Sequence, residues 1–114
     1  MIANAEQVAA AVELGKQMYQ TDEWLRNELR DAKVALENGG LEGLKLIVRD
    51  LSTDDHFKLN WWPRIEEMAG GDEDLAHEIL WHVWDGYTKA LALALDPTFT
   101  EGKNALSFNR LLFP

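Results

Sequence analysis

The stretch DEDLAHEILWHVWDGYTKALALALDP, residues 72–97, decides the fold of this chain. Asp72 precedes a periodic apolar run, and its side-chain oxygen can accept an orphan amide proton of a first helical turn. Pro97 ends the run, because the proline ring excludes continuation of a helix and disfavours helical geometry at Asp96. The sequence therefore predicts one long helix between the Asp72 cap and Asp96.

The polar and apolar side chains of this stretch separate onto two faces when successive residues are placed about 100° apart. The polar stripe consists of Asp74, Glu78, His82, Asp85 and Lys89. The opposite side consists of Ile79, Leu80, Val83, Tyr87, Ala90, Leu91 and Ala94. We therefore expect a central core helix with one wet edge. Gly86 lies at the border of the apolar side, where a missing side chain lets a neighbouring helix approach closely.

Shorter helices are predicted before this one from the three-and-four spacing of apolar residues. The first runs from about Asn4 to Tyr19. A second follows Thr21, which we expect to be its N-cap. Its apolar side is formed by Leu25, Leu29, Ala32 and Leu36. The pairs Gly39-Gly40 and Gly70-Gly71 are predicted to terminate helices.

Residues 41–51 also keep helical spacing, although a branched run within them leaves a short strand as the alternative. Helix is the expectation. Residues 52–55 predict a turn or a cap. Asn60 predicts a further cap, with Pro63 tolerated in the first turn of a short helix that ends near Met68.

These patterns predict an all-α fold: a small single-domain bundle of about five helices over residues 1–114, with a long central helix in its C-terminal half. The 114 residues include no cysteine, which excludes disulfides, thiolate metal sites and a thiol nucleophile. Residues 1–20 lack the basic start and the unbroken apolar stretch of a secretory signal. The apolar run 90–95 is far shorter than the ~20 residues of a membrane span. We expect a soluble, cytoplasmic protein.

The chain is strongly acidic, with 20 acidic residues against 11 basic ones and a formal net charge of −9. This charge repels phosphate backbones and anionic membrane surfaces, so direct binding of nucleic acid or membrane is not expected. Between Arg64 and Lys89 the chain carries no Lys or Arg. The acidic residues of this segment are Glu66, Glu67, Asp72, Glu73, Asp74, Glu78 and Asp85.

Five tryptophans stand at positions 24, 61, 62, 81 and 84, an excess that needs an explanation. For Trp24, Trp62 and Trp84 the expectation is core packing. Trp81 lies at the border of the polar stripe, and Trp61 and Trp62 are neighbours whose side chains diverge by about 100° on a helix. We therefore predict that Trp61 and Trp81, bordered by the acidic segment, form a partner-binding anchor with a charged rim.

Two constellations have residue types suited to metal binding or acid/base chemistry. Glu73 with His77, and Glu78 with His82, are pairs four residues apart whose side chains can meet on a helix. No second ligand pair of the kind used by di-iron bundles accompanies them, so a solvated helix face is the expectation. The turn Asp54-Asp55-His56 carries acid/base groups, but helix capping explains it as well.

The favoured functional hypothesis is a non-enzymatic, cofactor-free protein-binding module whose acidic surface docks on a basic patch of another protein. By analogy with phage-encoded anti-defence proteins and immunity proteins, it extends to a small inhibitor that occupies a nucleic-acid-binding surface. One alternative is a homodimer closed by Leu111, Leu112 and Phe113. Another is a small metal protein or enzyme that uses His77, His82 and nearby carboxylates.

Overall fold

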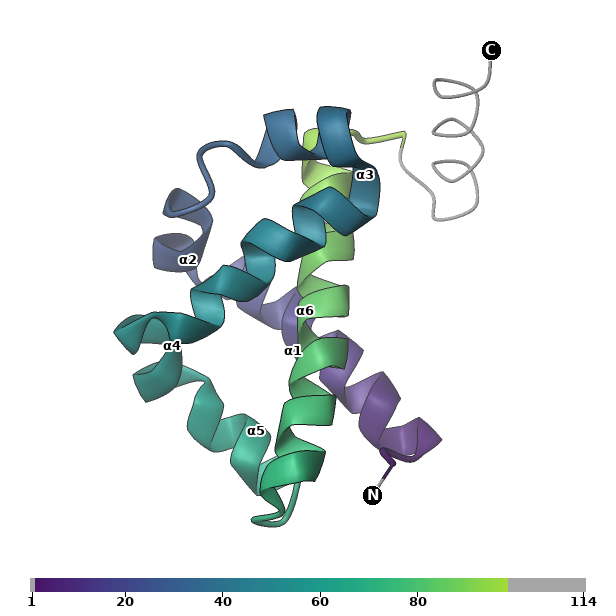
Figure 1. The fold of residues 1–114 in the computed structure, drawn as a ribbon, viewed down its shortest axis with the longest axis vertical. Coiled ribbons are helices and arrows are strands. Elements are labelled where there is room, and N and C mark those ends of the chain that lie inside the picture. The colour runs from purple at the N-terminus through teal and green to yellow at the C-terminus, as the bar shows by residue number, and fades with distance from the viewer. Residues whose placement is uncertain (1, 99–114) are drawn as a thin grey trace.

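The computed structural model describes residues 2–98, and within them every regular element is a helix. The predicted all-α fold is thereby confirmed, with six α-helices and one 3-10 turn in place of about five helices (Figure 1). In chain order these are α1 (Ala5–Thr21), α2 (Glu23–Asn27), α3 (Ala32–Arg49), η1 (Asp50–Thr53), α4 (Asp55–Asn60), α5 (Trp62–Met68) and α6 (Glu73–Leu95).

Helix α6 is the long helix predicted from residues 72–97, and it forms the axis of the fold (Figure 1). The Asp72 side chain accepts from the Leu75 amide at 3.0 Å, which confirms the predicted cap. The helix ends at Leu95, with Asp96 in extended backbone before Pro97. Its buried residues are Leu75, Ala76, Ile79, Val83, Trp84, Gly86, Tyr87, Thr88, Leu91 and Ala92.

Helices α1 and α6 cross in close contact, as Figure 1 shows, and two glycines make the crossing possible. A Cβ atom built on Gly86 would lie 2.0 Å from the Val12 carbonyl oxygen. A Cβ built on Gly15 would lie 2.0 Å from the Val83 carbonyl oxygen. The prediction that Gly86 admits a neighbouring helix is confirmed, and Gly15 does the same from the other side.

The start of the second helix differs from the prediction. Thr21 is not an N-cap, because its hydroxyl donates to the Gln17 carbonyl within the last turn of α1. Asp22 takes that role, with extended backbone and a carboxylate that accepts from the Leu25 amide at 3.1 Å. The helix it starts is only five residues long, and the chain turns at 28–31 before α3 begins.

Helix α3 contains the break that the glycine pair predicted, since Gly40 has a φ of 64° and non-helical geometry. Residues 41–49 then continue as helix, followed by the 3-10 turn η1, so the strand alternative is excluded. The predicted cap at Asn60 is wrong, because its side-chain amide donates to the His56 carbonyl inside α4. Trp61 is the residue before α5, and it caps that helix with no side-chain bond.

Candidate functional site

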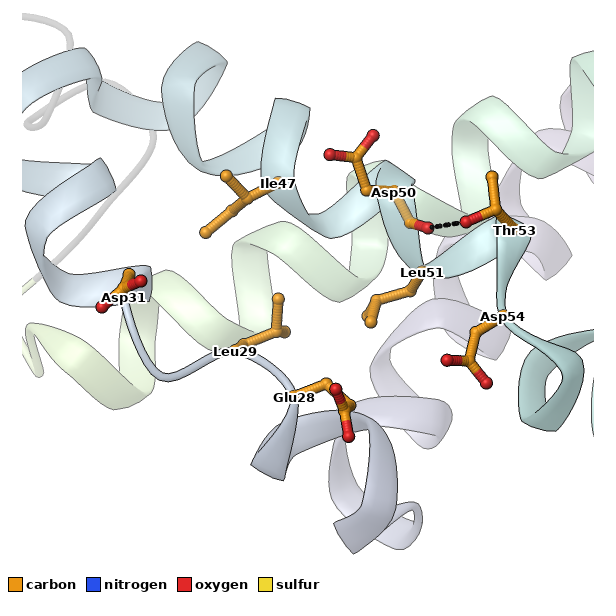
Figure 2. A pocket seen from close by; sticks show the side chains of 8 residues that line it. All are labelled: Glu28, Leu29, Asp31, Ile47, Asp50, Leu51, Thr53 and Asp54. Atoms are coloured by element: carbon orange, nitrogen blue, oxygen red, sulfur yellow. Dashed lines mark hydrogen bonds between the residues drawn. The ribbon is translucent and has the colours of Figure 1, made fainter.

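An acid-lined hollow of about 270 Å³ lies where the α2–α3 connection faces the end of α3 and η1 (Figure 2). Its apolar lining consists of Leu29, Ile47 and Leu51. Its polar lining consists of Glu28, Asp31, Asp50, Asp54 and Thr53. Figure 2 shows Glu28 and Asp31 on the connection between α2 and α3, across from Asp50 and Asp54.

Three of these four carboxylates make no hydrogen bond or ion pair within residues 2–98. Glu28, Asp31 and Asp50 are exposed, and Asp31 precedes α3 without capping it through its side chain. Asp54 is different, since its Oδ1 accepts from the His56 amide at 2.9 Å and caps α4. The capping role expected for the turn at 54–56 is thus confirmed. The hollow therefore combines apolar side chains with three carboxylates that have no partner among the described residues.

Sequence reasoning missed this hollow, because its eight lining residues come from two separate stretches of the chain, 28–31 and 47–54. The available signal was weak: two pairs of carboxylates, Glu28 with Asp31 and Asp50 with Asp54, each at an element boundary. Nothing in the linear pattern indicates that the chain turn at 28–31 brings the first pair opposite the second. Only the packing of α2 against the rest of the molecule does so.

Trp81 lies on α6 beside a second hollow of about 310 Å³, and 48% of its surface is exposed. The expectation that an indole of this protein stays accessible is met at this position. Two cations of α3 lie over its ring: the Lys45 Nζ at 5.9 Å and the Arg49 Cζ at 5.4 Å from the ring centroid. The hollow is lined by Arg49, Asp50, Ser52, Thr53, His77, Leu80, Trp81 and Trp84.

The other tryptophans divide between core and surface. Trp84 is 1% exposed, as expected of a core residue, and its indole N–H finds no acceptor within the described part of the chain. Trp62 is partly buried, with its ring 5.2 Å from that of His77. Trp24 is 39% exposed and stacks on His56, so its expected place in the core is wrong. The short α2 carries it at the surface because the long second helix does not form.

Trp61 belongs to a polar cluster around the buried Asp22 carboxylate. Asp22 Oδ2 accepts from the Trp61 indole N–H at 2.6 Å and lies 2.7 Å from His56 Nε2. Burial raises the pKa of Asp22, but the hydrogen bonds from Trp61, His56 and the Leu25 amide outweigh it and lower the pKa below its ordinary value. The guanidinium of Arg64 covers the Trp61 ring at 5.0 Å. The indole of Trp61 therefore has contacts within the protein, at a place distinct from the Trp81 hollow.

Three of the seven predicted acidic residues are engaged inside the fold. Asp72 caps α6, and a carboxylate oxygen of Glu78 accepts from the Ala3 amide at 2.8 Å. Asp85 pairs with Lys89 at 3.0 Å and with Lys45 at 3.5 Å. Partial burial raises the pKa of Asp85, and the two lysines more than offset it, so its pKa lies below the ordinary value. Exposed around the turn from α5 to α6 are Glu66, Glu67, Glu73 and Asp74.

Among the described residues, the histidine pairs on α6 do not converge on further ligands. Residues 2–98 contain no group of three or more His, Cys, Asp or Glu side chains that could hold a metal ion. No helix in this range is long and apolar enough to cross a membrane. The predicted dimer contacts Leu111, Leu112 and Phe113 lie outside the described residues.

Comparison of the chain with protein-family models, with curated proteins and with solved structures finds no match in any of the three.

Proposed function

We propose that this chain is a non-enzymatic, acidic protein-binding module that receives a basic segment of a partner protein in the acid-lined hollow between α2 and η1. The observation that carries the proposal is the arrangement in Figure 2, in which Glu28, Asp31 and Asp50, without a hydrogen bond or ion pair to another of residues 2–98, share the hollow with apolar side chains. Lysine and arginine side chains have the complementary structure, with an aliphatic stem and a cationic head. A stem packed on Leu29 and Leu51 leaves the head within reach of Glu28 and Asp31.

The net charge of −9 supports the same proposal, because it attracts a cationic partner over a long range. An acidic surface steers a cationic partner into encounter, while short-range contacts determine how long the complex lasts. A second exposed group, Glu66, Glu67, Glu73 and Asp74, adds to this field from the turn between α5 and α6. We extend the proposal to an inhibitor of the immunity-protein kind: basic surfaces commonly bind nucleic acid, and the chain would occupy such a surface in place of phosphate.

The hollow is tested by titrating a fluorescently labelled hepta-lysine peptide into the wild type and into Glu28→Gln/Asp31→Asn. Neither side chain makes a contact that holds the fold, so the variant should melt like the wild type. Loss of two charge-assisted contacts is expected to weaken binding about tenfold or more. Fluorescence anisotropy at fixed ionic strength gives the dissociation constants.

The matched control is Glu37→Gln/Glu42→Gln, which removes the same charge from exposed positions of α3 outside the hollow. This variant should bind the peptide within about twofold of the wild type, because only long-range attraction is reduced. Equal weakening in both variants would show that the hollow has no special part. A third variant, Glu66→Gln/Glu67→Gln/Glu73→Gln, measures the contribution of the predicted acidic segment.

A further inference from the structure

We propose that the partner segment carries an aromatic side chain next to its basic one, and that this ring docks in the hollow beside Trp81. The inference rests on the proposed function, because it concerns the same partner and the adjoining surface. It specifies the partner as a basic–aromatic segment of a protein, as distinct from a uniformly basic one.

The two hollows are neighbours on the surface. Asp50 and Thr53 of η1 line both of them, so one four-residue turn separates the acid-lined hollow from the Trp81 hollow. Figure 2 shows these two residues and the hydrogen bond that the Thr53 hydroxyl donates to the Asp50 carbonyl across the turn. A peptide that crosses η1 therefore reaches both hollows with side chains a few residues apart.

The charges of the two hollows favour different side chains of such a peptide. Glu28, Asp31 and Asp50 attract a cation on one side of η1. On the other side Arg49 lines the hollow, and it lies with Lys45 over the Trp81 ring. Because Arg49 and Asp50 both line that hollow, a second lysine of the partner gains no net attraction there. A neutral aromatic ring is attracted, because cations interact favourably with aromatic faces.

The apolar lining of the Trp81 hollow also suits an aromatic ring. Leu80 and Trp81 supply apolar surface, and the buried Trp84 contributes to the wall. Trp81 leaves 48% of its surface in water, which a docked ring would cover. Half-exposed tryptophans beside arginine are typical of the residues that dominate the affinity of protein interfaces.

The test compares two labelled peptides that differ by one residue: a lysine tetrapeptide segment followed by tyrosine, and the same peptide with alanine in place of tyrosine. The spacing between lysine and tyrosine is varied from one to five residues. At the best spacing, the tyrosine peptide should bind the wild type about tenfold more tightly than the alanine peptide. In Trp81→Ala and in Arg49→Gln this ratio should fall towards one.

The matched control is Leu93→Ala, which removes an apolar side chain of the same helix that is 47% exposed and lines neither hollow. It should keep the full tyrosine-to-alanine ratio. A ratio that persists in Trp81→Ala, or is absent at every spacing while Glu28→Gln/Asp31→Asn still weakens lysine binding, overturns this inference alone. If that double variant has no effect on either peptide, the proposed function fails and the inference falls with it.

Discussion

The carboxylate of Asp22 contacts three short helices, α2, α4 and the start of α5. Its Oδ1 accepts from the Leu25 amide and starts α2, while its Oδ2 lies against His56 of α4 and Trp61 at the start of α5. A buried carboxylate is favourable only when its oxygens are paired in this way. The short helices α2, α4 and α5 each bury one apolar side chain, which is Leu25, Phe57 and Ile65 respectively, and Asp22 adds a polar link among the three helices.

The first prediction concerns the stability of Asp22→Asn. Because the folded pKa of Asp22 lies below its ordinary value of 3.8, the carboxylate stabilises the fold at higher pH. That contribution is complete above the ordinary value and is lost as the pH falls through the lowered folded value. At pH 7 the variant should lose about 1.5–3 kcal/mol of unfolding free energy, the range for hydrogen bonds to charged groups. Urea unfolding measures it.

Measuring the unfolding free energy of both proteins at several pH values distinguishes the contribution of the Asp22 charge from a general effect of the mutation. The gap in stability between wild type and Asp22→Asn should narrow as the pH is lowered from about 5 through the acidic range. Neutralisation of the many surface carboxylates affects both proteins alike, so it cancels in the difference. A gap that stays constant down to the lowest measurable pH would show that the charge of Asp22 is unimportant.

At the scale of elements, the crossing of α1 and α6 holds the fold together. Gly15 and Gly86 allow the two backbones to touch, since a side-chain carbon at either position would collide with a carbonyl oxygen of the other helix. Ridges of side chains separate most helix pairs, with axes 8–10 Å apart. The two glycines replace such a ridge with direct backbone contact.

Gly15→Ala and Gly86→Ala should each destabilise the protein by about 3 kcal/mol or more, because the added methyl group forces the helices apart. Thermal melts followed by circular dichroism give the size of the effect. Gly39→Ala is the control: a Cβ there meets nothing within 4 Å. Since alanine favours helix over glycine, that variant should be unchanged or slightly more stable. Equal losses at all three positions would contradict the role of the crossing.

At the scale of the whole molecule, the acidic charge opposes folding, and under the proposed function it favours association with a basic partner. The net charge of −9 implies mutual repulsion among surface carboxylates, which the pairs of Asp85 with Lys45 and Lys89 relieve only locally. Salt shortens the reach of this repulsion from about 30 Å at 0.01 M to about 3 Å at 1 M. Stability and partner binding should therefore respond to salt in opposite directions.

Raising sodium chloride from about 10 mM to about 500 mM should increase the melting temperature, by roughly 4–8 °C for each kcal/mol of repulsion removed. Over the same range the hepta-lysine peptide should bind progressively more weakly. Differential scanning calorimetry and fluorescence anisotropy measure the two trends on one preparation. A melting temperature that falls with salt would show that the ion pairs outweigh the repulsion.

Local chemistry made much of this fold predictable. The Asp72 cap, the Pro97 stop, the apolar face of α6, the break at Gly40 and the close approach at Gly86 each follow from a residue and its immediate neighbours. The wrong predictions concern Thr21, Asn60 and Trp24. Thr21 and Asn60 bond back into the helix before them. Asp22 starts α2 through its Oδ1, while its Oδ2 meets His56 and Trp61 from distant parts of the chain.

The sequence by itself determined the all-α class, the long central helix, the acidic charge and the presence of an indole at the edge of α6. Only the tertiary structure decided which carboxylates are engaged and which have no partner within residues 2–98: it assigned Asp72, Glu78 and Asp85 to internal contacts and brought Glu28 and Asp31 opposite Asp50. The physical reason is the distance along the chain over which each interaction acts. Caps and periodicity act within a few residues, whereas a hollow forms where surfaces from separate helices meet.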